Sequence, residues 1–182
     1  MSTKIHVWSD YVCPFCLIAD ELIERAITDR TDVEVVHHAH ELRPHPRPTL
    51  RSEDPYLPDI WHRAVYPMAG RHEVSMELPS MSPQPYTDLA FRGAQYAADQ
   101  GRAESYHRRM MTAFFRENLD IRDRTVLARL AEEIGLDPAA STAYVIRSSS
   151  RVVSALMRRP RCPGRGGSRL RWRRPRCVGR RR

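Results

Sequence analysis

The sequence lacks any run of about 18 consecutive apolar residues, the length that a membrane-spanning helix needs. Its first fifteen residues also lack an apolar run of signal-peptide length. We therefore expect no export signal, no membrane partner and a cytoplasmic location. Cysteine is scarce, at 4 of 182 residues. Because cytoplasmic thiols are mostly reduced, a close cysteine pair there is more typical of a catalytic or metal-binding site than of a structural disulfide.

Acidic residues are absent from positions 158–182, although this segment holds twelve arginines. The remaining chain has 18 basic residues against 22 acidic ones, so residues 1–157 carry a net charge of −4 and the basic pI belongs to the end of the chain. Arginine, proline and glycine dominate that end, and few of its side chains are apolar. Such a segment cannot bury enough surface to offset the entropy of ordering it. We expect a folded domain over 3–157 and a disordered tail over 158–182.

The first forty residues have the pattern of a strand, a helix and a second strand. Ile5 and Val7 alternate with longer side chains, which is typical of a strand. Apolar residues recur at helical spacing after Pro14, and valines resume from Val33. Since a crossover of this kind is right-handed, the pattern predicts a parallel βαβ unit at about 3–40.

A different organisation follows this unit. Five prolines over 41–58 predict an extended connection, because proline disrupts both helices and central strands. Helical periodicity then indicates an all-helical section at about 55–150, in which Asp123 and Asp137 are expected to cap helices. This section contains five methionines that could line a groove for client peptides, although we favour core packing: Met68, Met76, Met81, Met110 and Met111.

The residues that point to chemistry are Cys13 and Cys16, in the sequence Cys-Pro-Phe-Cys. Directly after a strand, at a helix start and within a βαβ pattern, this spacing is typical of a redox pair. Helix amide groups favour a thiolate at Cys13, so we predict that Cys13 is the nucleophile and Cys16 the resolving thiol. Pro14 suits a first helical position and Phe15 adds no charge; both support the pair. This chemistry needs no metal and no organic cofactor.

Other uses of these cysteines are a zinc half-site or two buried thiols. A closed zinc site needs four ligands. Cys162 and Cys177 lie in the basic tail, while His37, His38, His40 and His45 could supply nitrogen atoms. His37 and His38 follow a strand and would point to opposite faces, so we interpret the histidines as ordinary, partly exposed residues.

The segment VWSDYVCPFCLIADELIERA resembles the start of DsbA-family oxidoreductases of the FrnE type, and HELRP at 40–44 resembles the segment after their second strand. The stretches starting YPMAGRHEV and FFRENLDIR resemble their helical insertion. This resemblance covers about residues 3–140. It implies an α/β, thioredoxin-like fold with an all-helical insertion, whose two motif cysteines catalyse thiol–disulfide exchange or isomerisation. Protein or small-molecule thiols and disulfides would be the partners, with recycling by glutathione or a thioredoxin system.

The resemblance stops before the end of the chain. The family continues with a Val-Pro turn, whose cis-proline faces the cysteines, and with a hairpin and a closing helix. No Val-Pro follows residue 140 here. We therefore expect a fold that is incomplete at the C-terminus, and the arginine-rich composition suggests an out-of-frame translation of a GC-rich gene. The underlying nucleotide sequence tests this hypothesis.

Two alternative functions stay open. The superfamily includes glutathione-dependent isomerases and transferases of the 2-hydroxychromene-2-carboxylate and kappa types, which carry serine where this chain has Cys13. A non-enzymatic zinc or nucleic-acid binder is the other alternative, since the arginines could bind phosphates in a salt-dependent way. Without a base-reading module, we expect the tail to bind polyanions only non-specifically.

Overall fold

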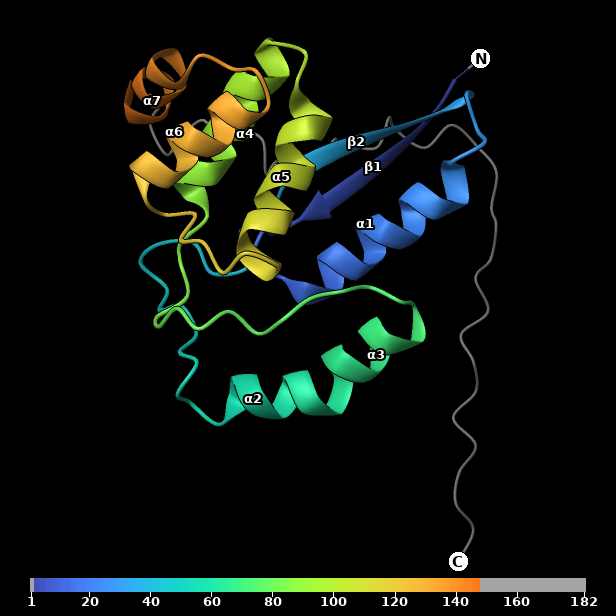
Figure 1. The fold of residues 1–182 in the computed structure, drawn as a ribbon, viewed down its shortest axis with the longest axis vertical. Coiled ribbons are helices and arrows are strands. Elements are labelled where there is room, and N and C mark those ends of the chain that lie inside the picture. Colours follow the sequence, from blue (N-terminus) through green and yellow to red (C-terminus); the bar gives the residue numbers. More distant parts are fainter. Residues whose placement is uncertain (1, 148–182) are drawn as a thin grey trace, which may run out of the picture.

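The computed structural model describes residues 2–147, and Figure 1 shows their arrangement. The strands are β1 (Thr3–Ser9) and β2 (Val33–Ala39). The helices are α1 (Pro14–Ile27), α2 (Tyr56–Ile60), a π-helical turn (Trp61–Val65), α3 (Tyr66–Arg71), α4 (Asp88–Asp99), α5 (Ala103–Phe115), α6 (Arg124–Glu133) and α7 (Pro138–Arg147). The end of the predicted domain at 157, the basic tail over 158–182, Cys162 and Cys177 lie outside the described residues.

The predicted order of strand, helix and parallel strand is confirmed. β1 and β2 pair in parallel, with Val7 opposite His37 and Trp8 opposite His38. Because side chains alternate along a strand, His37 and His38 lie on opposite faces, as the sequence predicts. His38 stacks on Trp8 with ring centroids 4.7 Å apart. His37 faces α1, where its Nδ1 lies 3.9 Å from an Asp20 carboxylate oxygen. Helix α1 therefore packs on the face of the sheet that carries His37, and the Trp8–His38 stack lies on the opposite face.

Helices α4 to α7 pack together beside the sheet, and α5 is the helix of this group that packs against β2 (Figure 1). Among the described helices, α5 contributes the most buried hydrophobic residues to the core, and its Met110, Met111 and Phe114 are fully buried. Met76 is buried as well, and Met81 packs against the core while partly exposed. Met68 is 36% exposed, so core packing is confirmed for Met76, Met110 and Met111 but is wrong for Met68. The result is a thioredoxin-like fold with a small sheet and a large helical part.

Two helix starts follow the predicted capping chemistry. The Asp123 carboxylate accepts hydrogen bonds from the Thr125 and Val126 amide groups at 2.7 and 3.4 Å. Asp137 accepts in the same way from Ala139 and Ala140 at 2.8 and 3.0 Å. These bonds satisfy amide groups that the first turn of a helix leaves without a partner.

The first helical stretch of the predicted all-helical section is less regular than a single α-helix. Helical structure begins at Tyr56, so Pro58 lies in a first turn rather than in the extended connection. Proline is accepted there because its missing N–H would have had no partner. The Tyr66 amide then donates to the Trp61 carbonyl, which is π-helical spacing, and Pro67 follows with no amide hydrogen to continue the regular pattern.

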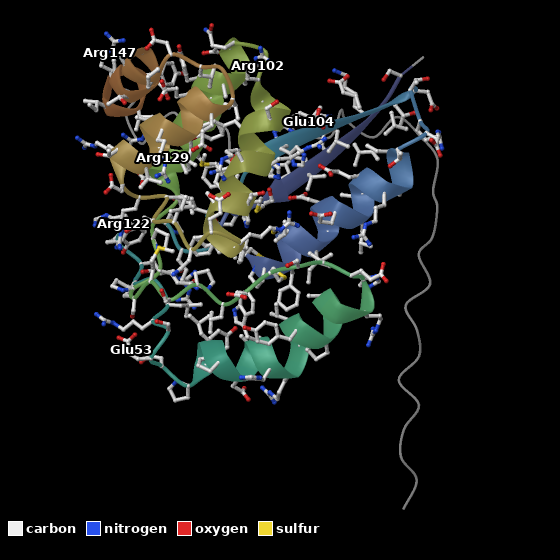
Figure 2. All side chains as sticks on the ribbon, in the orientation of Figure 1. Glu53, Arg102, Glu104, Arg122, Arg129 and Arg147 are labelled. Carbon is white, nitrogen blue, oxygen red and sulfur yellow. The ribbon has the colours of Figure 1, made fainter. Side chains whose placement is uncertain are left out.

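The surface of the described part is rich in charge. Figure 2 shows labelled charged side chains directed away from the body of the chain, such as Arg122 in the turn before α6 and Arg129 on α6. Many of these charges are paired: Arg122, for example, contacts Asp120 at 2.9 Å. Within residues 2–147 no helix is long and apolar enough to cross a membrane.

Candidate active site

The two motif cysteines lie at the start of α1, shortly after the end of β1. Cys13 is the N-cap residue of α1, with extended backbone angles, and Pro14 occupies the first helical position. The Cys13 amide donates to the Asp10 carbonyl at 3.1 Å, and the Cys16 amide donates to the Cys13 carbonyl at 3.0 Å. Both thiols are free and partly buried. The local sequence thus places the Cys13 sulfur at the N-terminus of α1 and the Cys16 sulfur in the first turn of the same helix.

The surroundings of the two sulfurs push their pKa values in opposite directions. A hydrogen bond from the Cys16 thiol, helped by the amide groups of Cys16 and Phe15, lowers the pKa of Cys13 to about 7, although burial opposes the change. The same hydrogen bond, together with burial and the negative charge at Cys13, raises the pKa of Cys16 above its ordinary range. Cys13 can therefore attack as a thiolate at neutral pH while Cys16 keeps its proton. The roles assigned to the two residues stay predictions.

Asp10 holds the loop that carries Cys13, and the sequence patterns did not indicate it. Its buried carboxylate accepts hydrogen bonds from the Leu42 amide at 2.7 Å and the Thr87 hydroxyl at 2.8 Å. It thereby joins the end of β1 to the segment after β2 and to the start of α4. Burial raises the pKa of Asp10, while the hydrogen bonds oppose that rise. The available signal was an acidic residue three positions before the first cysteine.

A cavity of about 190 Å³ opens beside Cys13. Pro14 and Phe15, the two residues predicted to support the cysteines, form part of its wall, and Phe15 is 38% exposed. Arg43 is the cation among the lining residues. The apolar wall also includes Val12, Leu42, Leu50, Tyr56, Leu57, Ile60, Trp61, Pro85 and Tyr86. Such a hollow can receive an apolar part of a thiol or disulfide substrate next to the reactive sulfur.

The histidines considered as zinc ligands do not gather at the cysteines. His38 stacks on Trp8, and His45 lies against the Tyr86 ring at 5.6 Å between centroids. His40 is exposed. His37 instead joins Asp20 and His107, a residue that sequence reasoning missed, in a group of three possible metal ligands within residues 2–147. No short-range pattern could indicate this group, because its members come from three separate elements.

Comparison with known proteins gives a consistent result. Residues 4–159 match the family model of the DSBA-like thioredoxin domain. YwbO from Bacillus subtilis (strain 168) is 43% identical over 141 residues, which is 77% of this chain and 70% of that protein.

Three similar solved structures have the same fold. A probable DsbA oxidoreductase from Streptomyces coelicolor is 23% identical, with a TM-score of 0.66 over 85% of this chain and 73% of that one. The cytosolic disulfide reductase DsbM from Pseudomonas aeruginosa is 18% identical, with a TM-score of 0.65 over 85% and 74%. A 2-hydroxychromene-2-carboxylate isomerase is 14% identical, with a TM-score of 0.67 over 85% and 77%.

Proposed function

Because this chain belongs to the DSBA-like thioredoxin domain family, we propose that it is a thiol–disulfide oxidoreductase or isomerase that acts through Cys13 and Cys16. One observation carries the proposal: the pKa of Cys13 is lowered to about 7 by the Cys16 thiol and by the amide groups at the start of α1. About half of the Cys13 sulfur is then ionised at neutral pH, compared with a few per cent for an ordinary thiol near pKa 8.5.

The exchange has two balanced steps. The Cys13 thiolate attacks one sulfur of a substrate disulfide, forms a mixed disulfide and releases the other sulfur as a thiolate. The Cys16 thiol then gives up its proton and attacks the Cys13 sulfur, which releases the second substrate thiol and leaves a Cys13–Cys16 disulfide. The substrate gains two electrons and the cysteine pair loses two. In the reverse direction the pair oxidises a dithiol. In isomerisation another thiolate of the substrate attacks the mixed disulfide, which forms a new substrate disulfide and releases Cys13 as a thiolate with no net oxidation.

Small thiols are the recycling partners that we propose. Two glutathione molecules could reduce the Cys13–Cys16 disulfide and would become oxidised glutathione; a thioredoxin system could supply the same electrons. DsbM, which resembles this chain in fold, has also been solved with GSH and is described as cytosolic. We propose the cytoplasm as the compartment, where reduced thiols are abundant.

Trapping the mixed disulfide tests the two assigned roles. With a model disulfide peptide, a Cys16→Ala variant should accumulate a covalent adduct at Cys13, because the resolving thiol is missing. A Cys13→Ser variant should form no adduct and should lose exchange with the peptide. A Cys162→Ser/Cys177→Ser double variant is the control and should keep the parent rate.

Two outcomes would count against the proposal. One is a Cys13→Ser variant that reduces or oxidises the peptide at the parent rate. The other is tight glutathione binding with no redox cycling of the cysteine pair, which would favour a glutathione-dependent isomerase or transferase. Mass spectrometry of the adduct identifies the sulfur that carries the peptide.

A further inference from the structure

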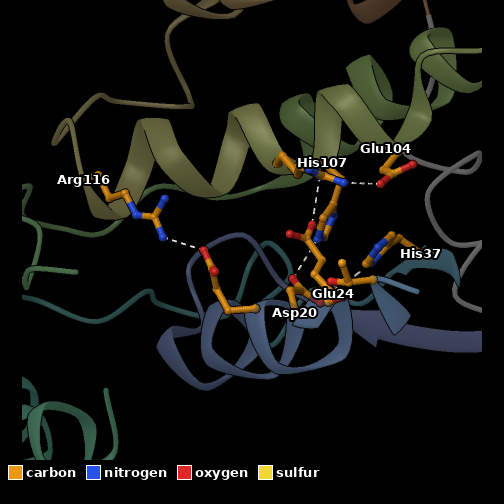
Figure 3. Close-up of polar contacts among 9 residues, drawn as sticks. Asp20, Glu24, His37, Glu104, His107 and Arg116 are labelled. Atoms are coloured by element: carbon orange, nitrogen blue, oxygen red, sulfur yellow. Dashed lines mark hydrogen bonds and ion pairs between the residues drawn. The ribbon is translucent and has the colours of Figure 1, made fainter. Parts of the chain in front are cut away.

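A second polar cluster lies on α1, one helical turn after Cys16. The Asp20 carboxylate from α1 meets His107 from α5 and His37 from β2, and Figure 3 shows the three side chains converging between these elements. Asp20 Oδ2 is 2.8 Å from His107 Nε2, and Asp20 Oδ1 is 3.9 Å from His37 Nδ1. The two imidazole rings are stacked, with centroids 3.7 Å apart and an angle of 19° between their planes. One oxygen or nitrogen atom from each residue lies within 4.8 Å of the others.

Two polar atoms of this cluster have no hydrogen-bond partner in the described part of the chain. They are Asp20 Oδ1 and His37 Nδ1, both shielded from solvent and facing each other. The side chain of Asp20 is only 9% exposed, and that of His107 only 5%. Because buried polar groups are almost always satisfied, this pair of unpartnered atoms indicates a missing ligand between them.

We propose that Asp20, His37 and His107 bind one divalent transition-metal ion of the Zn²⁺ class. Imidazole nitrogen and carboxylate oxygen are established ligands of such ions, at about 2.0–2.2 Å. Ligand atoms around one tetrahedral ion at those distances lie about 3.4 Å apart. The two histidines approach different oxygens of the Asp20 carboxylate, at 2.8 and 3.9 Å, and the candidate ligand atoms of all three residues lie within 4.8 Å of one another. The side chains would therefore have to rotate to bring three ligand atoms to one ion.

The cluster has a route by which an ion could enter. Asp20 and His37 line a cavity of about 310 Å³, together with Glu24, Glu34 and Glu104. Glutamates at a cavity favour cations over anions. Their charges are partly balanced, because Arg108 pairs with both Glu24 and Glu104, and Lys4 pairs with Glu34 at 3.1 Å. The buried Asp20 carboxylate would supply the negative charge in direct contact with the ion.

Such an ion would join parts of the chain that are otherwise distant in sequence. It would connect α1 and β2 of the βαβ unit to α5 of the helical section. Because metal that binds only the folded chain stabilises it by mass action, the free energy of unfolding should rise with metal concentration. This site uses no cysteine, so it is independent of the disulfide chemistry proposed above.

Cobalt binding to the full chain tests the proposal with a spectroscopic signal. All four cysteines are first alkylated under native conditions, so that Cys13 and Cys16 cannot bind the metal. Titration with Co²⁺ should then give one ion per chain, with visible d–d bands and no thiolate charge-transfer band. Zn²⁺ should displace the Co²⁺ and raise the Tm.

Single substitutions identify the ligands. His107→Gln, His37→Gln and Asp20→Asn should each weaken Co²⁺ binding at least about tenfold, since even outer-shell changes at metal sites cost 10–100-fold. His38→Gln changes the adjacent histidine on the opposite face of the sheet and should bind Co²⁺ like the parent. Circular dichroism checks that each variant is folded.

The proposal is overturned if the alkylated parent binds no stoichiometric metal, or if all three ligand variants bind Co²⁺ as tightly as the parent. If one variant fails to fold, the other two still decide the result. Loss of the Zn²⁺-dependent rise in Tm in those variants, but not in His38→Gln, supports the site by a second measurement.

Discussion

At Cys13, opposing influences act on a single sulfur atom. The Cys16 thiol and the amide groups of Phe15 and Cys16 stabilise its thiolate, whereas burial and the negative charge of Asp10 disfavour it. The hydrogen bond from Cys16 is the largest of these influences, and the net result is a pKa of about 7. Besides the resolving role that we propose for it, Cys16 therefore stabilises the thiolate of Cys13, because its thiol proton forms a hydrogen bond with the neighbouring sulfur.

Replacing Cys16 by alanine should make Cys13 a weaker nucleophile at neutral pH. Without the thiol donor, the pKa of Cys13 should rise from about 7 toward the ordinary value near 8.5, which lowers the thiolate fraction at pH 7 about tenfold. The Cys16→Ser variant keeps a hydrogen-bond donor at this position, so its thiolate fraction at Cys13 should fall less. The measurement is the pH dependence of iodoacetamide alkylation at Cys13, followed in the Cys13 peptide by mass spectrometry. Identical alkylation profiles for the alanine, serine and parent proteins would contradict this role of Cys16.

Between elements, the contact of α4 with α5 depends on a glycine. Gly93 lies in α4 directly against Tyr106 of α5, and a methyl group at Gly93 would overlap the Tyr106 hydroxyl and the ring carbon that carries it. Tyr106 is 1% exposed, so its rigid ring cannot swing out to make room. The absent side chain at Gly93 therefore sets how closely the two helices approach.

Gly93→Ala should destabilise the protein by about 1–3 kcal/mol, the usual cost of overpacking a core. Gly70→Ala is the matched control, because a methyl group there meets no atom within 4 Å. That variant should be neutral or slightly stabilising, since alanine favours a helix more than glycine does. Urea denaturation of both variants measures the difference.

The cost of Gly93→Ala should be smaller in a Tyr106→Phe background, because part of the overlap is with the hydroxyl group. Equal stabilities for the Gly93→Ala and Gly70→Ala variants would show that α4 and α5 can separate without cost.

At the scale of the whole molecule, the sequence predicted what depends on residues close together in the chain. The parallel βαβ unit follows from alternating and helical periodicities within forty residues. The caps at Asp123 and Asp137 each involve amide groups two and three positions later. The thiolate-stabilising position of Cys13 also follows from its place at the start of one helix.

The unpredicted parts depend on contacts between residues that are distant in sequence. Asp10 binds Leu42 and Thr87, which lie 32 and 77 positions further along the chain. Asp20 and His107 are 87 positions apart. Each of these residues has an unremarkable neighbourhood in the sequence, and only the packing of α4 and α5 beside the βαβ unit brings the partners together. A single sequence therefore indicates the candidate cysteine pair, but not the buried polar residues that pack around it, such as Asp10, Asp20 and His107.

The pH dependence of global stability should reflect Glu41, in the connection after β2. Burial and the negative charges of Asp88 and Asp10 raise the pKa of Glu41 from 4.5 to about 7, although Arg92 opposes the change. Between these two values the folded chain keeps a proton that the unfolded chain has lost. The free energy of unfolding should therefore fall as pH rises from 4.5 to 7.

Glu41→Gln removes this titration, because an amide is neutral at every pH in the range. At pH 8 the variant should be more stable than the parent by about 1–2 kcal/mol, a figure reduced for the partial exposure of the side chain, and near pH 4.5 the two should agree. Urea denaturation between pH 4.5 and 8 measures both curves. Glu132→Gln changes an exposed glutamate and should follow the parent throughout. If the Glu41→Gln curve declines as steeply as the parent curve, another group must cause the loss of stability, and Glu41 is ionised in the folded chain at much lower pH.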